Sequence, residues 1–96
     1  MIVNRVVFRV KPGKMEKAVQ FAKEIGVKLF DPGHSRLYTD NFAPHSSLSI
    51  EIEFKNFAAI DNLQAAWRGH PDVEEWEKTW NEVFESGGTT EIWDLV

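Results

Sequence analysis

The period of the hydrophobic pattern changes several times along this 96-residue chain, and the order of these changes constrains the fold most. Apolar and polar residues alternate in some segments, as in a strand, and apolar residues recur every three or four positions in others, as in a helix. In chain order these segments are strand 2–10, helix 15–29, strands 34–42 and 47–54, helices 57–67 and 71–84, and strand 89–96. The sequence therefore predicts the order β-α-β-β-α-β, with its second helix broken at Gly69-His70-Pro71.

This order predicts an α+β fold of the ferredoxin-like type, in which residues 1–96 form one domain with an antiparallel sheet and helices on one of its faces. A chain of this size buries about 60–65% of the surface that its unfolded form exposes. It has no cysteine, so no disulfide can supplement the core. Burial therefore has to come from the chain itself or from a second copy of it.

The alternation gives the sheet an apolar face toward the helices and a mixed face away from them. The mixed face is expected to carry Val3, Arg5, Val7, Arg9, Ser49, Glu51, Glu53, Trp93 and Leu95. Strands one and three are neighbours in this topology, so the two arginines are expected to pair with the two glutamates. A face that combines ion pairs with apolar residues fits association with an identical face, and the alternative is an ordinary solvated face.

The net charge of −4 argues against nucleic acid as a partner. The charge is uneven, because residues 1–36 carry +5 and residues 37–96 carry −9. Such asymmetry favours contacts between early and late segments, within one chain or between two. No apolar run approaches about 18 residues, so no membrane span is expected. The first residues lack a signal pattern, which favours the cytoplasm.

With these features the sequence resembles the dimeric α/β-barrel superfamily, which includes antibiotic-biosynthesis-type monooxygenases and NIPSNAP-like proteins. The resemblance is carried by a first strand that closes in Lys11-Pro-Gly-Lys14, the broken helix around Trp67-Arg-Gly-His-Pro71, and a short terminal strand. It implies a homodimer joined sheet to sheet. It also implies a small-molecule pocket in each chain, between the helices and the sheet, and chemistry that needs no cofactor.

Haem-degrading members resemble this chain in a first-strand Asn4-Arg5 pair and in Trp67 of the second helix. Those enzymes also have an iron-binding histidine about three helical turns later, where this chain has Glu77. A carboxylate is a poor substitute for a proximal imidazole, so haem degradation is disfavoured. The acidic run that includes Glu77 is typical of a solvated helix face.

Five residues are predicted to line the pocket. Asn4 alternates onto the helix-facing side beside Val6 and Phe8, where it can orient a substrate carbonyl or dioxygen. The structural alternative is an amide bonded to backbone or water. Trp67 is placed to line the mouth, whereas Trp80 belongs by default to the core and is the fifth binding candidate. Aromatic walls of this kind suit flat, polycyclic substrates.

His70 and Tyr38 are the candidates for proton transfer. An imidazole titrates near neutral pH, and a phenol can donate to a phenolate or a carbonyl. The alternatives are capping or solvent exposure for His70 and packing for Tyr38. The other histidines, His34 and His45, show no metal-ligand spacing, although a site with a nearby aspartate (Asp31 or Asp40) stays an alternative.

Two classes of function are open at this stage. The first is a small-molecule-binding dimer that acts as a cofactor-independent monooxygenase, or a related isomerase or cyclase, on a hydrophobic or aromatic substrate. The second is a non-catalytic ligand-binding, interaction or stress protein of the NIPSNAP-like type. A cavity of about 300 Å³ or more with convergent polar groups would favour binding or catalysis. A filled core with Asn4 bonded to the backbone would favour the second class.

Overall fold

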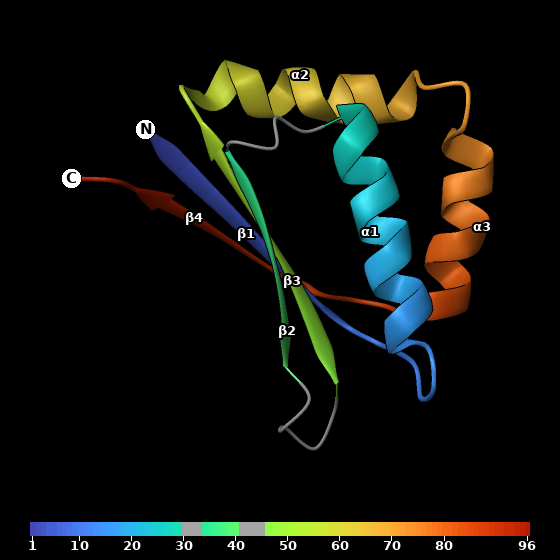
Figure 1. Ribbon diagram of the computed structural model, residues 1–96. Coiled ribbons are helices and arrows are strands. Elements are labelled where there is room, and N and C mark those ends of the chain that lie inside the picture. The colour runs from blue at the N-terminus through green and yellow to red at the C-terminus, as the bar shows by residue number, and fades with distance from the viewer. Residues whose placement is uncertain (30–33, 41–45) are drawn as a thin grey trace.

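The structure is a computed structural model that describes residues 1–29, 34–40 and 46–96. The elements are β1 (Ile2–Arg9), α1 (Met15–Leu29), β2 (Ser35–Asp40), β3 (Ser47–Phe54), α2 (Phe57–Arg68), α3 (Val73–Val83) and β4 (Thr89–Asp94). The four strands lie in the order β2-β3-β1-β4, and every neighbouring pair is antiparallel. The predicted α+β, ferredoxin-like arrangement is confirmed (Figure 1).

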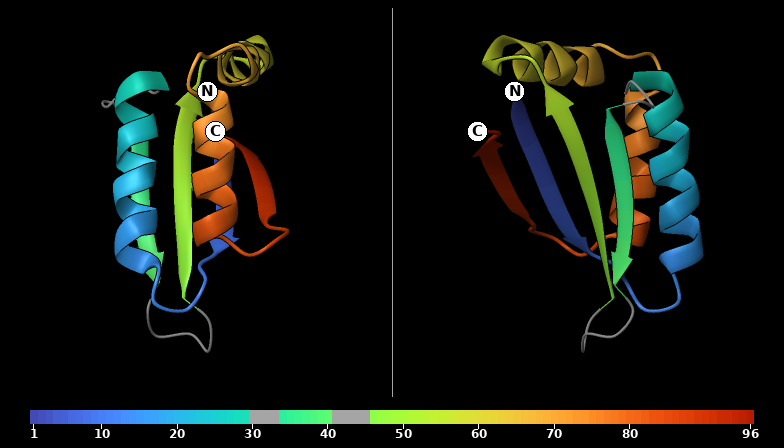
Figure 2. Two further views of the ribbon diagram at one scale, coloured as in Figure 1. Left: turned by 90° about the vertical axis from the view of Figure 1, so that its right-hand side faces the viewer. Right: turned by 60° about the vertical axis from the view of Figure 1, so that its left-hand side comes forward.

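The helices form one layer against one face of the sheet. Helices α1 and α3 lie next to each other over this face, and α2 crosses one end of the sheet (Figure 1). Strand β4 forms the edge farthest from α1, whereas β2 forms the edge nearest to it (Figure 2). The two termini lie close together, because the backbone N–H of Leu95 donates to the carbonyl oxygen of Met1 at 3.0 Å. No described helix is long and apolar enough to cross a membrane.

Most element boundaries agree with the sequence pattern, and the differences have local causes. Asn56 caps α2, since its Oδ1 accepts a hydrogen bond from the N–H of Ala59 at 3.0 Å. Helix α3 begins at Val73 rather than at Pro71, which lies in the preceding turn. It ends before the Gly87-Gly88 pair because Phe84 is already extended.

The strands differ slightly from their predicted lengths. Strand β4 ends at Asp94, two residues earlier than expected, and the last two residues of the predicted strand 34–42 lie outside the described residues. Most of the predicted turn between β2 and β3, at 43–46, lies outside the described residues.

The core lies between the sheet and the helices. Leu48 of β3 and Val83 of α3 are fully buried there, among apolar residues of α1 such as Phe21 and Ile25. A smaller cluster under α2 joins one end of the sheet, where Ile2 is paired with Phe54, to that helix through Ile60. Side chains of β1 and β3 alternate between this core and the outer face, as predicted.

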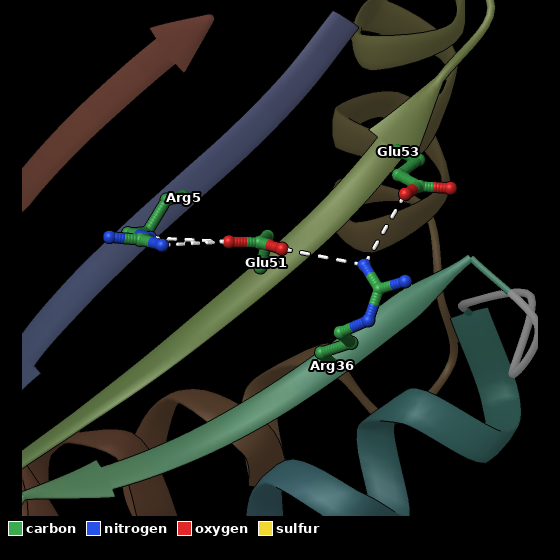
Figure 3. A network of polar contacts seen from close by, with 4 residues as sticks. All are labelled: Arg5, Arg36, Glu51 and Glu53. Atoms are coloured by element: carbon green, nitrogen blue, oxygen red, sulfur yellow. Dashed lines mark hydrogen bonds and ion pairs between the residues drawn. The ribbon is translucent and has the colours of Figure 1, made fainter. Parts of the chain in front are cut away.

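The outer face carries a network of four charged side chains from three strands (Figure 3). Arg5 lies 3.0 Å from Glu51, and Arg36 lies 3.4 Å from Glu51 and 3.3 Å from Glu53. The expected pairing of Arg5 with a β3 glutamate is confirmed. The expected role of Arg9 is wrong, because Arg9 pairs with Glu85 at 3.7 Å beyond the sheet, and Arg36 takes its place in the network.

The uneven charge of the sequence is neutralised within one chain. Lys17 of α1 lies 2.6 Å from Glu82 of α3, and Lys28 lies 2.8 Å from Asp72 just before α3. The hydrogen bond from Lys28 is the largest influence on Asp72 and holds the pKa of that carboxyl below its usual value. The basic first third of the chain is therefore held against the acidic remainder by pairs across the helix layer.

Candidate functional site

A partly open cavity of about 170 Å³ lies between the inner sheet face and all three helices. Strands β1 and β3 form its floor, and α1, α2 and α3 contribute its walls. The lining residues are Asn4, Val6, Phe8, Phe21, Ala22, Ile25, Ile50, Ile52, Leu63, Trp67, Trp80 and Phe84. No titratable side chain is among these described residues, so the interior of the cavity is apolar except for one amide and two indole N–H groups.

Asn4 is that amide, and its position follows from strand alternation. In the register of the sheet it lies between Ile52 of β3 and Ile92 of β4, with Val6 two residues further along the same face. Its Oδ1 is buried and has no hydrogen-bond partner among the described residues. Burial without a partner costs about 1–3 kcal/mol for such a group. The structural alternative, an amide bonded to the backbone, therefore does not hold for this atom.

Aromatic rings enclose the cavity on the side of α2 and α3. Trp80 meets Phe8 edge to face, with the ring centroids 4.5 Å apart, and meets Trp67 edge to face at 6.1 Å. Trp80 also packs against Phe84 at 4.7 Å. Such contacts fix the planes of the indoles and leave their faces and edges toward the cavity as its wall.

The cavity brings together five of the seven residues predicted from the sequence: Asn4, Val6, Phe8, Trp67 and Trp80. His70 is near but does not line it. Its ring stacks on Trp76 at 4.3 Å, and its Nδ1 accepts a hydrogen bond from the N–H of Asp72 at 3.1 Å. Trp76 in turn packs against Trp67 at 5.0 Å. His70 therefore supports the aromatic wall from behind and stabilises the turn before α3.

Tyr38 lies on the other side of the sheet. Its register partner in β3 is Ser49, which in turn is opposite Val7 in β1, so all three belong to the outer face. Tyr38 is half exposed there, and the cavity is on the opposite side of the backbone. The structure does not bring it to the pocket within one chain.

The described residues contain no group of three or more metal-ligating side chains placed to hold an ion. Two of the residues considered for a metal site are at opposite ends of β2. His34 directly precedes the strand, and Asp40 is its last residue. His45 and Asp31 are outside the described residues.

A second hollow, of about 400 Å³, lies against the same two indoles on the side of α3. Trp67 and Trp80 line it together with Glu77 and Asn81. The acidic run of the sequence predicts a solvated face for Glu77. No sequence pattern indicates a role for Asn81. The available signal is their spacing, because residues 77 and 81 are four apart and each follows a tryptophan of the buried stripe.

Comparison with known proteins identifies the fold and not a sequence family. No protein-family model matches the chain, and no curated protein matches it either. A NIPSNAP family protein from Agrobacterium tumefaciens is similar in structure, with a TM-score of 0.81 and 13% identity over 99% of this chain and 92% of that one. An uncharacterized NIPSNAP domain protein from Burkholderia xenovorans gives 0.77 and 11% over 100% and 95%.

The fold is also that of an antibiotic biosynthesis monooxygenase, with a TM-score of 0.73 and 17% identity over 100% of this chain and 99% of that one. The chain has the NIPSNAP and antibiotic-monooxygenase fold. This confirms the fold that the resemblance implies. At 11–17% identity the likeness concerns the fold alone, and the roles of Asn4, Trp67 and the other site residues stay predictions.

Proposed function

We propose that the cavity binds a small, single-ring molecule that carries a hydroxyl or another hydrogen-bond donor. The observation that supports this most is the buried, unpartnered Oδ1 of Asn4 in an otherwise apolar cavity. Since this atom is an acceptor, the group that satisfies it is a donor, while the Nδ2 of the same amide can donate to a carbonyl such as the one considered from the sequence. A ligand hydroxyl would supply the missing hydrogen bond while the ring fills the apolar space.

The size of the cavity limits the ligand. Its volume of about 170 Å³ is below the 300 Å³ typical of drug-sized pockets and close to the roughly 150 Å³ in which an engineered cavity binds benzene. The polycyclic substrates that the tryptophans suggested are too large for it. A phenol-sized molecule fits, with Phe8, Trp67 and Trp80 against its ring.

A bound water explains the site less well. A buried water typically makes two to four hydrogen bonds. Apart from the indole N–H groups of Trp67 and Trp80, Asn4 has the only polar side chain among the described lining residues.

Titration with phenol and toluene tests this proposal. Phenol is expected to bind about five- to tenfold more tightly than toluene, since a buried hydrogen bond contributes about 1 kcal/mol. In Asn4→Leu this preference should disappear, whereas Asn62→Leu, an exposed asparagine of α2, should keep it. Calorimetry that finds no phenol binding, or an unchanged preference in Asn4→Leu, would contradict the proposal.

Oxygenation without a cofactor is the second candidate, and the monooxygenase of the same fold favours it. In this reading Asn4 positions a one-ring hydroquinone for reaction with dioxygen. The described lining contains no acid or base, so the proton would have to leave toward the solvent. Oxygen uptake that scales with protein and is lost in Asn4→Leu would support catalysis. Oxygen uptake no faster than in buffer would support binding without catalysis, as in a non-catalytic NIPSNAP-like protein.

We also propose that the outer sheet face joins a second copy of the chain, in the cytoplasm. Trp93 and Leu95 are 60% and 65% exposed, which is unfavourable for large apolar side chains in water. The charged network in Figure 3 lies between these two residues and β2. Its charges are already paired within one chain. Such a face can be buried without leaving isolated charges. Light scattering after size exclusion should give twice the chain mass of 11.1 kDa.

A further inference from the structure

The hollow beside the cavity has the composition of a site for an organic cation. Its volume is about 400 Å³, and its described walls are two indoles, one carboxylate and one carboxamide. The electron-rich faces of indoles attract ammonium groups, and a carboxylate beside them adds a full opposite charge. Trp67 and Trp80 line both spaces, so the cavity and the hollow adjoin at these two indoles.

Glu77 is available for such a contact. It lies in the middle of α3, is exposed, and has no ion-pair or hydrogen-bond partner among the described residues. Glu82 and Asp72 differ in this respect, because Glu82 is held by Lys17 and Asp72 by Lys28. Those two pairs neutralise the side of α3 that faces α1 and leave the carboxylate of Glu77 unneutralised.

Basic side chains near the hollow do not reach this carboxylate. Lys11 is close to the end of α3, but its Nζ donates to the backbone carbonyl of Asn81 at 2.6 Å. Lys78 follows Glu77 in the helix and therefore points about 100° away from it around the helix axis. Glu77 is the one charged side chain among the described residues that line the hollow, and its carboxylate attracts a cation and repels an anionic substituent.

We infer that the ligand of this site is a one-ring arylalkylamine, with its ring in the cavity and its ammonium group at Glu77 between the two indoles. The inference rests on the proposed function, because it extends the same ligand out of the same cavity. The ring hydroxyl donates to Asn4 at one end, and Glu77 binds the charge at the other. A chain of about two carbons joins ring and ammonium.

Three ligands that share a hydroxyphenyl ring test the inference by calorimetry at low salt: tyramine, tyrosol and 3-(4-hydroxyphenyl)propionate. They differ in a cationic, a neutral and an anionic end. Tyramine is expected to bind about tenfold more tightly than tyrosol, from an ion pair and a cation–π contact of modest strength each, and the propionate more weakly than tyrosol. Glu77→Gln should remove the advantage of tyramine.

Glu74→Gln is the matched control, since it removes the same charge from an exposed position of the same helix outside the hollow. It should keep the advantage of tyramine. If tyrosol binds and tyramine binds no more tightly, or if Glu77→Gln keeps the full advantage, the inference is overturned and the proposed function stands. If none of the three ligands binds, the proposed function fails and the inference with it.

Discussion

The two faces of the sheet satisfy their polar groups in different ways. On the outer face, four charged side chains neutralise one another across three strands, while Trp93 is left in solvent. On the inner face, the helices cover nearly all the apolar surface, while the Oδ1 of Asn4 is left without a partner. The outer face therefore lacks apolar cover, and each face leaves one buried polar atom without a partner among the described residues, Ser49 Oγ on the outer face and Asn4 Oδ1 on the inner face.

This difference indicates what each face would bind. An apolar surface with paired charges is complemented by a large, similar surface, which a second copy provides. A buried acceptor in an apolar cavity is complemented by a small molecule with one donor and a ring. In these two proposals, assembly and ligand binding use opposite faces of the same four-stranded sheet.

The largest effect is expected from a pair of neighbouring substitutions in β3. Leu48 faces the core and is fully buried, so Leu48→Ala should lower the free energy of unfolding by about 2–5 kcal/mol. Ser49 faces outward and its Oγ has no partner among the described residues, so Ser49→Ala should change stability by less than about 1 kcal/mol. Urea unfolding measures both, and similar losses would mean that the faces are not as different as described.

The second effect concerns the outer face. Trp93→Lys introduces a residue that edge strands tolerate, and it removes the apolar group expected at the centre of the dimer contact. Truncation of such an aromatic anchor typically costs 2 kcal/mol or more, which is about 30-fold in the dimer dissociation constant. Ile92→Lys, on the inner side of the same strand, is the control. Equal dissociation of both variants in sedimentation experiments would show that the strand and not the face is responsible.

Asn4→Leu should raise stability. The substitution removes an unpartnered buried acceptor and adds apolar contacts, so the free energy of unfolding should increase by about 1–2 kcal/mol. For a domain of this size each kcal/mol raises the thermal midpoint by roughly 4–8 °C. Calorimetric scans without ligand measure this. A lower midpoint would mean that the amide has a structural partner in the folded protein.

The smallest effect is expected from ion pairs at the exposed edge of the helix layer. There, charge rather than burial contributes to the stability of the fold. The hydrogen bond from Lys17 lowers the pKa of Glu82 below its usual value of 4.5, with a smaller influence from Lys14. A carboxyl with a lowered pKa in the folded state contributes stability above that usual value, and the contribution is lost as the pH falls through the folded pKa.

The thermal midpoint of the natural sequence should therefore fall slightly more steeply below pH 4.5 than that of Glu82→Gln. Because the pair is exposed, the difference should shrink at high salt. Glu75→Gln, whose side chain has no partner among the described residues, should behave like the natural sequence. A large loss of stability in Glu82→Gln at neutral pH would show that ion pairs rather than buried apolar contacts hold the helices on the sheet.

The sequence predicts much of the fold because hydrophobic period and face assignment are local properties. The clean alternation of 47–54 places Leu48 and Ile50 inward, and antiparallel pairing then places Asn4 correctly. The segment that forms β2 has no such alternation, so its faces follow only from its register with β3. This is why Tyr38 was considered for the pocket although Ser49, its partner, belongs to the outer face.

Side-chain reach and cavity shape were not predictable in the same way. A long arginine side chain can reach several nearby carboxylates. Whether Arg9 pairs with Glu85 depends on where the chain turns after α3. The volume of the cavity depends on how four aromatic rings pack, which no local pattern specifies. The alternation identified Asn4 as a candidate, and only the packing shows that its acceptor lacks a partner.

A crystal structure of the protein soaked with phenol tests the central claim most directly. The account predicts one phenol in the cavity of each chain, its hydroxyl oxygen within hydrogen-bond distance of Asn4 Oδ1 and its ring against Trp67 and Trp80. A cavity closed by side chains, or an Asn4 amide bonded to the backbone or to ordered water while phenol lies elsewhere, would contradict it.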